Sequence, residues 1–242
     1  MFFRSARRSA DPRLLEWARF AEEFEFVEAD ELEERLLEQF GLGEGQLVPI
    51  YALRREAQPL VVAFDQRRER SGPTGSVTTL RTFVAVRAQS GQGAPPMRAS
   101  ARRGKALESL EAARSGAERL DLPEDRPFEE SVSVYTREPL GAKAVLTPAV
   151  REILGRLLTA ADQAALQANG TDGTFATTVA PSLVVGPRNL LLCLEPRNAL
   201  PVQALGPLLA DMLSLNVALE AASRQLVEAL LGEAHSGDAL LE

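Results

Sequence analysis

The stretch PLVVAFDQRRERSGPTGSVTTLRTFVAVR, from Pro59 to Arg87, has the pattern of a β-hairpin. Two runs rich in Val, Thr and Phe alternate in the manner of strands, and the segment between them, Ser71 to Gly75, is dense in turn-forming residues. The pattern predicts strands over 59–69 and 77–87. An antiparallel sheet is therefore expected at the centre of the fold.

Asp65 ends the first apolar run, which is where several phosphoryl-transfer enzymes present a nucleophilic aspartate. Dehalogenase-type phosphotransferases need a second aspartate two residues further on, and this chain has Arg67 there. A receiver domain needs alternating strands and helices instead of a meander. We therefore interpret Asp65 as a residue on the polar side of the hairpin.

The alternation also predicts how the two strands pair. Even-numbered apolar residues in both strands, from Leu60 to Phe64 and from Leu80 to Val86, are expected to face inward. Aligning these two sets puts Asp65 opposite Arg81. We expect a cross-strand Asp65–Arg81 pair on the side away from the buried residues, worth at most about 0.2–1 kcal/mol.

Composition disfavours several classes of function. The chain has 242 residues, a net charge of -7, 45% hydrophobic and 25% charged residues, which suits a globular protein and disfavours nucleic-acid binding. Cys193 is the only cysteine and lies in an apolar run, so it is expected in the core. His235, the only histidine, lies in the tail, so neither a histidine base nor a metal site nor a cofactor site is predicted.

The remaining pattern predicts an α+β fold, in which a mostly antiparallel sheet (a meander plus a later hairpin) is covered by helices. Asp30 and Glu33 suggest a capping box, and Thr147-Pro148 is a strong helix start. The expected helices are 13–24, 30–40, 105–117, 147–167 and a long C-terminal one over 201–231. Further strands are expected at 47–54, 97–102 (a short edge strand), 128–137, 175–185 and 190–195, the last of these central and covered on both faces.

We expect one α+β domain over residues 13–232, preceded by a basic segment (1–12) and followed by a flexible tail (233–242). A sub-boundary is possible near 104–127. Helix, strand, turn and strand follow one another after Asp30 and again after Thr147, which leaves open a diverged internal repeat. Neither a signal peptide nor a convincing membrane segment is visible, so a cytoplasmic location is expected.

The segment from Asp121 to Glu130 is the candidate for carboxylate chemistry. A hydrolase needs two carboxyl groups with separated pKa values, and five occur here in ten residues. Pro123 and Pro127 equally indicate a surface connection, and we favour that interpretation. The five candidates are Asp121, Glu124, Asp125, Glu129 and Glu130.

The C-terminal helix carries apolar residues spaced alternately three and four apart, which is the spacing of a coiled-coil seam. An asparagine in such a seam can set the register of a dimer. The alternative, which we favour, is a long helix that covers this chain's own sheet. The possible seam residues are Leu205, Leu209, Met212, Asn216, Leu219 and Leu226.

The layout resembles an uncharacterised bacterial family, a domain of unknown function often found in membrane-tethered proteins. The matching features are a strand ending in Phe64-Asp65, a later strand led by Phe128, the tripeptide Leu146-Thr147-Pro148 and the apolar hairpin Leu183–Leu194. The resemblance would cover about Trp17 to Leu219. It implies a fold and brings no catalytic residues, and this chain departs from it in lacking an evident membrane segment.

These observations favour a non-catalytic cytoplasmic interaction or scaffold domain, whose expected partner is a second copy bound through the C-terminal helix or another protein. Two alternatives stay open. One is a carboxylate-based hydrolase that uses the segment 121–130. The other is a protein that binds a small ligand between its sheet and its helices.

Overall fold

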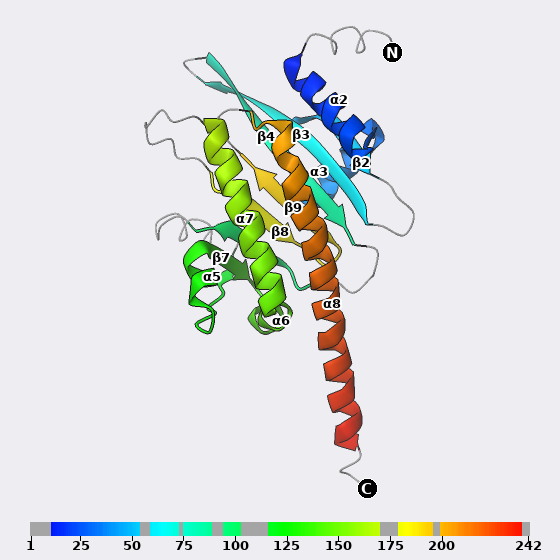
Figure 1. The fold of residues 1–242 in the computed structure, drawn as a ribbon, viewed down its shortest axis with the longest axis vertical. Helices are drawn as coiled ribbons and strands as arrows, with labels where there is room; N and C mark the ends of the chain where they lie inside the picture. The colour runs from blue at the N-terminus through cyan, green and yellow to red at the C-terminus, as the bar shows by residue number, and fades with distance from the viewer. Residues whose placement is uncertain are drawn as a thin grey trace.

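The computed structural model describes residues 11–53, 59–72, 75–88, 94–102, 116–169, 179–195 and 199–238. The fold is α+β, as predicted, with an antiparallel sheet and helices on both of its faces (Figure 1). Residues 1–10 of the basic segment and residues 105–115 of the expected helix lie outside the described residues.

Within the described residues the strands form one sheet of nine, in the order β1-β2-β3-β4-β9-β8-β5-β7-β6. The β8–β9 hairpin sits between β4 and β5, so β9 is central, as expected. The prediction that residues 97–102 form an edge strand is wrong, because β5 pairs with β7 on one side and β8 on the other. The strands are β1 (Val27–Glu28), β2 (Gln46–Leu53), β3 (Leu60–Gly72), β4 (Gly75–Arg87), β5 (Met97–Ala101), β6 (Glu118–Arg119), β7 (Val132–Thr136), β8 (Ser182–Val185) and β9 (Asn189–Leu194).

The described helices are close to the expected ones. Helix α6 was not expected, and one segment that was expected to be a strand begins as a helix. The segment predicted as a strand over 128–137 begins as a helix, because Asp125 caps it and a proline stands in its first turn. Only its second half is strand β7. The helices are α2 (Pro12–Phe24), η1 (Asp30–Leu32), α3 (Glu33–Phe40), α5 (Arg126–Ser131), α6 (Pro139–Val145), α7 (Pro148–Asn169), η2 (Val202–Ala204) and α8 (Leu205–Asp238).

Asp30 is not the N-cap of α3, which the expected capping box requires it to be. Asp30 begins the 3-10 turn η1, and α3 starts at Glu33 without a side-chain cap. Glu33 Oε1 instead accepts a hydrogen bond from the N–H of Leu47 on β2, at 3.1 Å. Gly41 ends α3, in the left-handed conformation at φ 56°.

Two hydrophobic cores lie on opposite faces of the sheet. The larger, front core contains Trp17 of α2 and the buried stripes of α7 and α8. The smaller, back core lies under η1 and α3, around Phe64 and Phe83. The helix–strand–strand order does occur twice, but α3 covers the back face whereas α7 covers the front face.

The predicted register of β3 and β4 is wrong by one residue. Asp65 is opposite Thr82, and Gln66 is opposite Arg81. The prediction assumed that the even-numbered residues of both strands face one core. Because both faces are covered, those of β3 face the back core and Val84 and Val86 of β4 face the front core.

Candidate functional site

Asp125 and Glu129 of the acidic segment hold the local backbone in place. Asp125 Oδ1 accepts a hydrogen bond from the N–H of Phe128 at 3.2 Å and so caps α5. Glu129 Oε1 accepts a hydrogen bond from the N–H of Leu122. Both candidate carboxylates therefore have structural partners.

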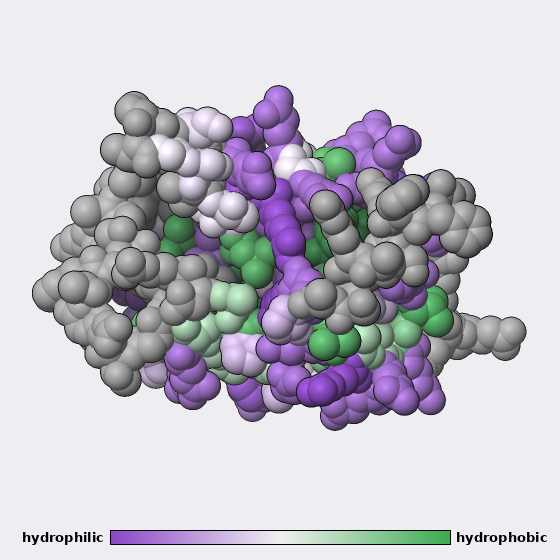
Figure 2. Space-filling model, turned by 90° about the horizontal axis from the view of Figure 1, so that it is seen from above, coloured by the Kyte–Doolittle hydropathy of each residue, from purple (hydrophilic) through white to green (hydrophobic). Residues whose placement is uncertain are grey.

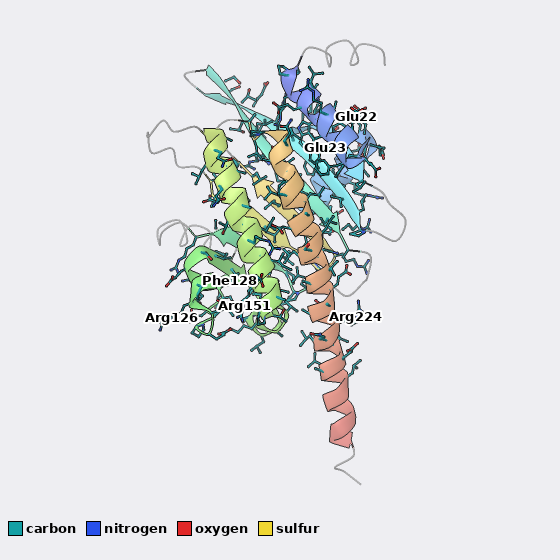
Figure 3. All side chains as sticks on the ribbon, viewed as in Figure 1. Glu22, Glu23, Arg126, Phe128, Arg151 and Arg224 are labelled. Carbon is teal, nitrogen blue, oxygen red and sulfur yellow. The ribbon has the colours of Figure 1, made fainter. Side chains whose placement is uncertain are left out.

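Arg151 of α7 brings two acidic residues of this segment together. Its side chain is about 10% exposed, and its Nη1 donates to Glu124 Oε1 at 2.8 Å. Asp125 Oδ2 is 3.1 Å from Arg151 Nε, an ion-pair contact in which the N–H is not directed for a hydrogen bond. Figure 3 shows Arg151 with Phe128 where α5 meets α7.

The surroundings of Glu124 shift its pKa in the direction opposite to the one that a general acid needs. The pKa of Glu124 is lowered by its own backbone N–H and then by Arg151, whereas a general acid needs a raised pKa. Asp121 and Glu130 point into solvent. The structure therefore gathers Glu124 and Asp125 around a cation, and among the described residues no ion pair joins Asp121 or Glu130 to that arginine.

Asp65 is the centre of a buried polar cluster. Its side chain accepts hydrogen bonds from Trp17 Nε1 at 2.8 Å and from Thr82 Oγ1 at 2.7 Å. Arg13 holds the same carboxylate with two nitrogens, Nε at 2.8 Å and Nη2 at 3.1 Å. Asp65 is 0% exposed, so the expectation that it faces away from the buried residues is wrong.

A second arginine–aspartate ion pair joins α2 to β3. Here the aspartate belongs to the α2 side and the arginine to β3, the reverse of the Arg13–Asp65 pair. Asp11, which caps α2, is bound by Arg67 of β3 at 2.7 Å. This hydrogen bond lowers the pKa of Asp11. Helix α2 is thus attached to β3 by two arginine–aspartate pairs, and Arg13 Nη1 also donates to the carbonyl of Leu200, just before α8. We name these interactions the α2 latch.

The sequence contained a clue to the latch that our interpretation did not use. Arg13 and Trp17 are one helical turn apart, so they share a face of α2. A buried tryptophan needs an acceptor for its N–H, and a buried arginine needs a carboxylate. Asp65 at the end of an apolar run was the available acceptor.

The possible seam of α8 faces this chain's own sheet over most of its length. Five of its residues are buried in the front core, and Leu226 is partly buried against it. Asn216 Nδ2 donates to Glu220 Oε1 on the same helix at 3.0 Å. The five residues that the structure buries within the chain are Leu205, Leu209, Met212, Asn216 and Leu219.

The end of α8 leaves the body of the molecule. Figure 1 shows the helix extending past α6 and α7, and it continues to Asp238 instead of ending near residue 231. Leu230 and Leu231 on this end are 59% and 57% exposed. Among the described residues, the helical stretch Val202–Leu231 is long and apolar enough to cross a membrane, although 44% of its most apolar window is buried in the fold.

The opposite end of the molecule has a different surface. Figure 2 shows hydrophilic side chains around separate hydrophobic areas on the described residues there.

The described residues contain no group of three or more His, Cys, Asp or Glu side chains placed to hold a metal ion. Burial raises the pKa of the Cys193 thiol to about 11, so this thiol is protonated and a poor nucleophile near neutral pH.

Comparisons with known proteins found no matching family model, curated protein or solved structure. The resemblance to an uncharacterised bacterial family therefore stays an expectation that rests on its motifs alone.

Proposed function

We propose that this protein is a non-catalytic interaction domain that pairs with a second copy of itself through the projecting end of α8. The proposal rests on the apolar face of α8. The first part of this face is buried in the fold, and the same face continues onto the projecting end of the helix. Leu219 and Ser223 are buried, Leu226 is partly buried, and Leu230 is exposed. These four positions follow one another at spacings of four, three and four residues.

The carboxylate geometry supports a non-catalytic role. Glu124 and Asp125 form ion pairs with Arg151, and Asp65 is enclosed by donors within the core. Glu124 and Asp125 are thus engaged by a cation, and the Asp65 carboxylate, which is 0% exposed, has no path to a substrate.

A second copy fits the projecting end better than other occupants do. A seam of this spacing packs best against a helix with the same repeat, and a homodimer supplies one without a further component. Residues 224–231 carry one positive and one negative side chain, Arg224 and Glu228, so two copies do not repel each other there. Their neutral charge also gives no attraction to an anionic lipid surface.

The test is the molar mass of the full chain by light scattering, over a wide range of concentration. We expect the wild type to move from monomer to dimer as concentration rises. The double variant Leu230→Glu, Leu231→Glu should stay monomeric, because it places charges in the seam. Val217→Glu is the matched control, since Val217 is an exposed apolar residue of α8 on the side away from the buried stripe.

A wild type that stays monomeric at the highest concentration contradicts the proposal. A dimer that survives the double variant and dissociates with Val217→Glu places the contact elsewhere on the helix and also contradicts it.

A further inference from the structure

The back face of the sheet has a thin cover. Among the described helices, only η1 and the short helix α3 lie over the back core. The one fully buried side chain of α3 is Leu36. Moving this short helix away from the sheet breaks fewer buried contacts than moving α7 or α8, so local opening should cost less free energy here than on the front face.

A small apolar cavity lies beneath this cover. Its helix wall includes Leu36 and Phe40, and its sheet wall includes Leu60, Val62 and Ala85. The cavity measures about 30 Å³, which is room for about one water molecule. A larger guest therefore enters only if α3 shifts outward.

Polar groups at one end of the cavity come from two neighbouring strands, β4 and β9, and from α3. Leu60, Arg87 and Asn189 are directly opposite one another on β3, β4 and β9. Arg87 lines the cavity together with Arg35 of α3, and both are exposed and form no ion pair with another described residue. The Oδ1 of Asn189 is buried without a hydrogen-bond donor.

The charge of this rim is opposite to that of its surroundings. The chain carries a net charge of -7, and α3 contains Glu33, Glu34 and Glu38. None of these glutamates lines the cavity, and its lining contains two arginines and no carboxylate. A guest with an apolar chain and an anionic head matches this distribution.

We propose that α3 is the movable cover of a binding site for a single-chain amphipathic carboxylate, of the fatty-acid class. The alkyl chain lies between α3 and strands β3 and β4, in contact with Leu36, Val62 and Ala85. The carboxylate is held by Arg35 and Arg87. This site is on the opposite face of the sheet from α8 and is independent of the proposed dimer.

The test uses the full chain and two probes with the same alkyl chain, dodecanoate and dodecyltrimethylammonium, both below their micelle concentrations. Isothermal titration calorimetry should show saturable binding of one dodecanoate per chain. The cationic probe should bind at least about tenfold more weakly, because it loses the charge-assisted hydrogen bonds to the two arginines. Hydrogen exchange of the α3 amides should change when dodecanoate binds.

Variants connect the binding to this cavity. Arg35→Gln with Arg87→Gln should weaken dodecanoate binding about tenfold or more without unfolding the chain, since both side chains are exposed. Ala85→Leu should weaken binding by filling the cavity. Arg224→Gln, an exposed arginine on α8, is the matched control and should bind as the wild type does.

Four results overturn the proposal: no binding of dodecanoate, equal affinity for the two probes, unchanged affinity in the double arginine variant, or α3 exchange that does not respond. The variant Leu230→Glu, Leu231→Glu should still bind dodecanoate. Failure of the dimer and failure of this site are therefore observed separately.

Discussion

At the scale of single residues, the Asp65 carboxylate holds several parts of the chain together. Arg13 and Trp17 reach it from α2 and Thr82 from β4, and the same arginine contacts the chain just before α8. Removing one partner of a buried ion pair leaves the other charge without compensation. The side chain that resembled a nucleophile in the sequence therefore has a structural role.

Asp65→Asn should lower the free energy of unfolding by about 3–5 kcal/mol, because it leaves the buried Arg13 guanidinium with only the partly exposed Glu16 as an opposite charge. Urea unfolding followed by circular dichroism measures this change. Arg81→Gln is the control and should cost about 0–1 kcal/mol, because Arg81 pairs with the partly exposed Glu195. A double-mutant cycle should show strong coupling between Asp65 and Arg13. Coupling of equal size between Asp65 and Arg81 would contradict the register of β3 and β4.

Asp11 makes a pH-dependent contribution. Its pKa is lowered in the folded chain from an ordinary value of 3.8, chiefly by the hydrogen bond from Arg67. The folded state therefore favours the carboxylate, and the stability that it adds is present above about pH 4 and lost as the pH falls through the folded pKa.

Asp11→Asn isolates this charge, because asparagine still caps a helix. We expect the wild type to be more stable than the variant by about 0–1 kcal/mol near neutral pH, since the pair is partly exposed. The difference should shrink to zero as the pH falls below the folded pKa. Asp11→Ala should cost about 1 kcal/mol more, because it also removes the cap. A difference that grows toward low pH contradicts the sign of the pKa shift.

At the scale of elements, the α3 cover differs from the helices of the front face. Helices α7 and α8 each contribute a stripe of buried residues, whereas α3 contributes one fully buried side chain. Local opening should therefore begin on the back face of the sheet.

Leu36→Ala should destabilise the protein by about 2–4 kcal/mol and accelerate amide exchange in α3, because it removes the only deep anchor of that helix. Leu37→Ala is the matched control on the same turn. It should cost less than about 1.5 kcal/mol, since Leu37 is only partly buried. Equal costs for the two variants would mean that Leu36 does not anchor the helix.

The sequence predicted the positions of helices and strands more reliably than it predicted which of their faces are covered and which strands are neighbours. Alternation and turn residues located β3 and β4, and Thr147-Pro148 located α7. Alternation alone does not reveal whether one or both faces are covered, so the register of Asp65 was missed. Phe128 lies in a helix instead of the expected strand, because Asp125 and Pro127 before it form a helix start. The position of the β8–β9 hairpin between β4 and β5 is a long-range arrangement without a local pattern.

At the scale of the whole molecule, α8 is divided between two environments. Its first part completes the front core and contacts α7, as in the Arg156–Asp211 ion pair. Its last part extends beyond the body (Figure 1). Three- and four-residue spacing is common to both parts, so the sequence did not distinguish a helix that covers its own sheet from one that pairs with a partner.

A chain that ends after Glu228 tests this division directly. It retains every residue of α8 that the structure buries in the front core, including Leu226, and it lacks the exposed Leu230 and Leu231. We expect its free energy of unfolding, measured with the protein dilute enough to be monomeric, to be within about 1 kcal/mol of the wild type. Self-association at high concentration should be lost, because the exposed part of the seam is gone. A chain ended after Leu215 is the contrasting variant and should not fold, since it lacks Leu219 and Ala222 of the core. If the chain ended after Glu228 is itself unfolded, the projecting segment belongs to the folding unit and the division of α8 is wrong.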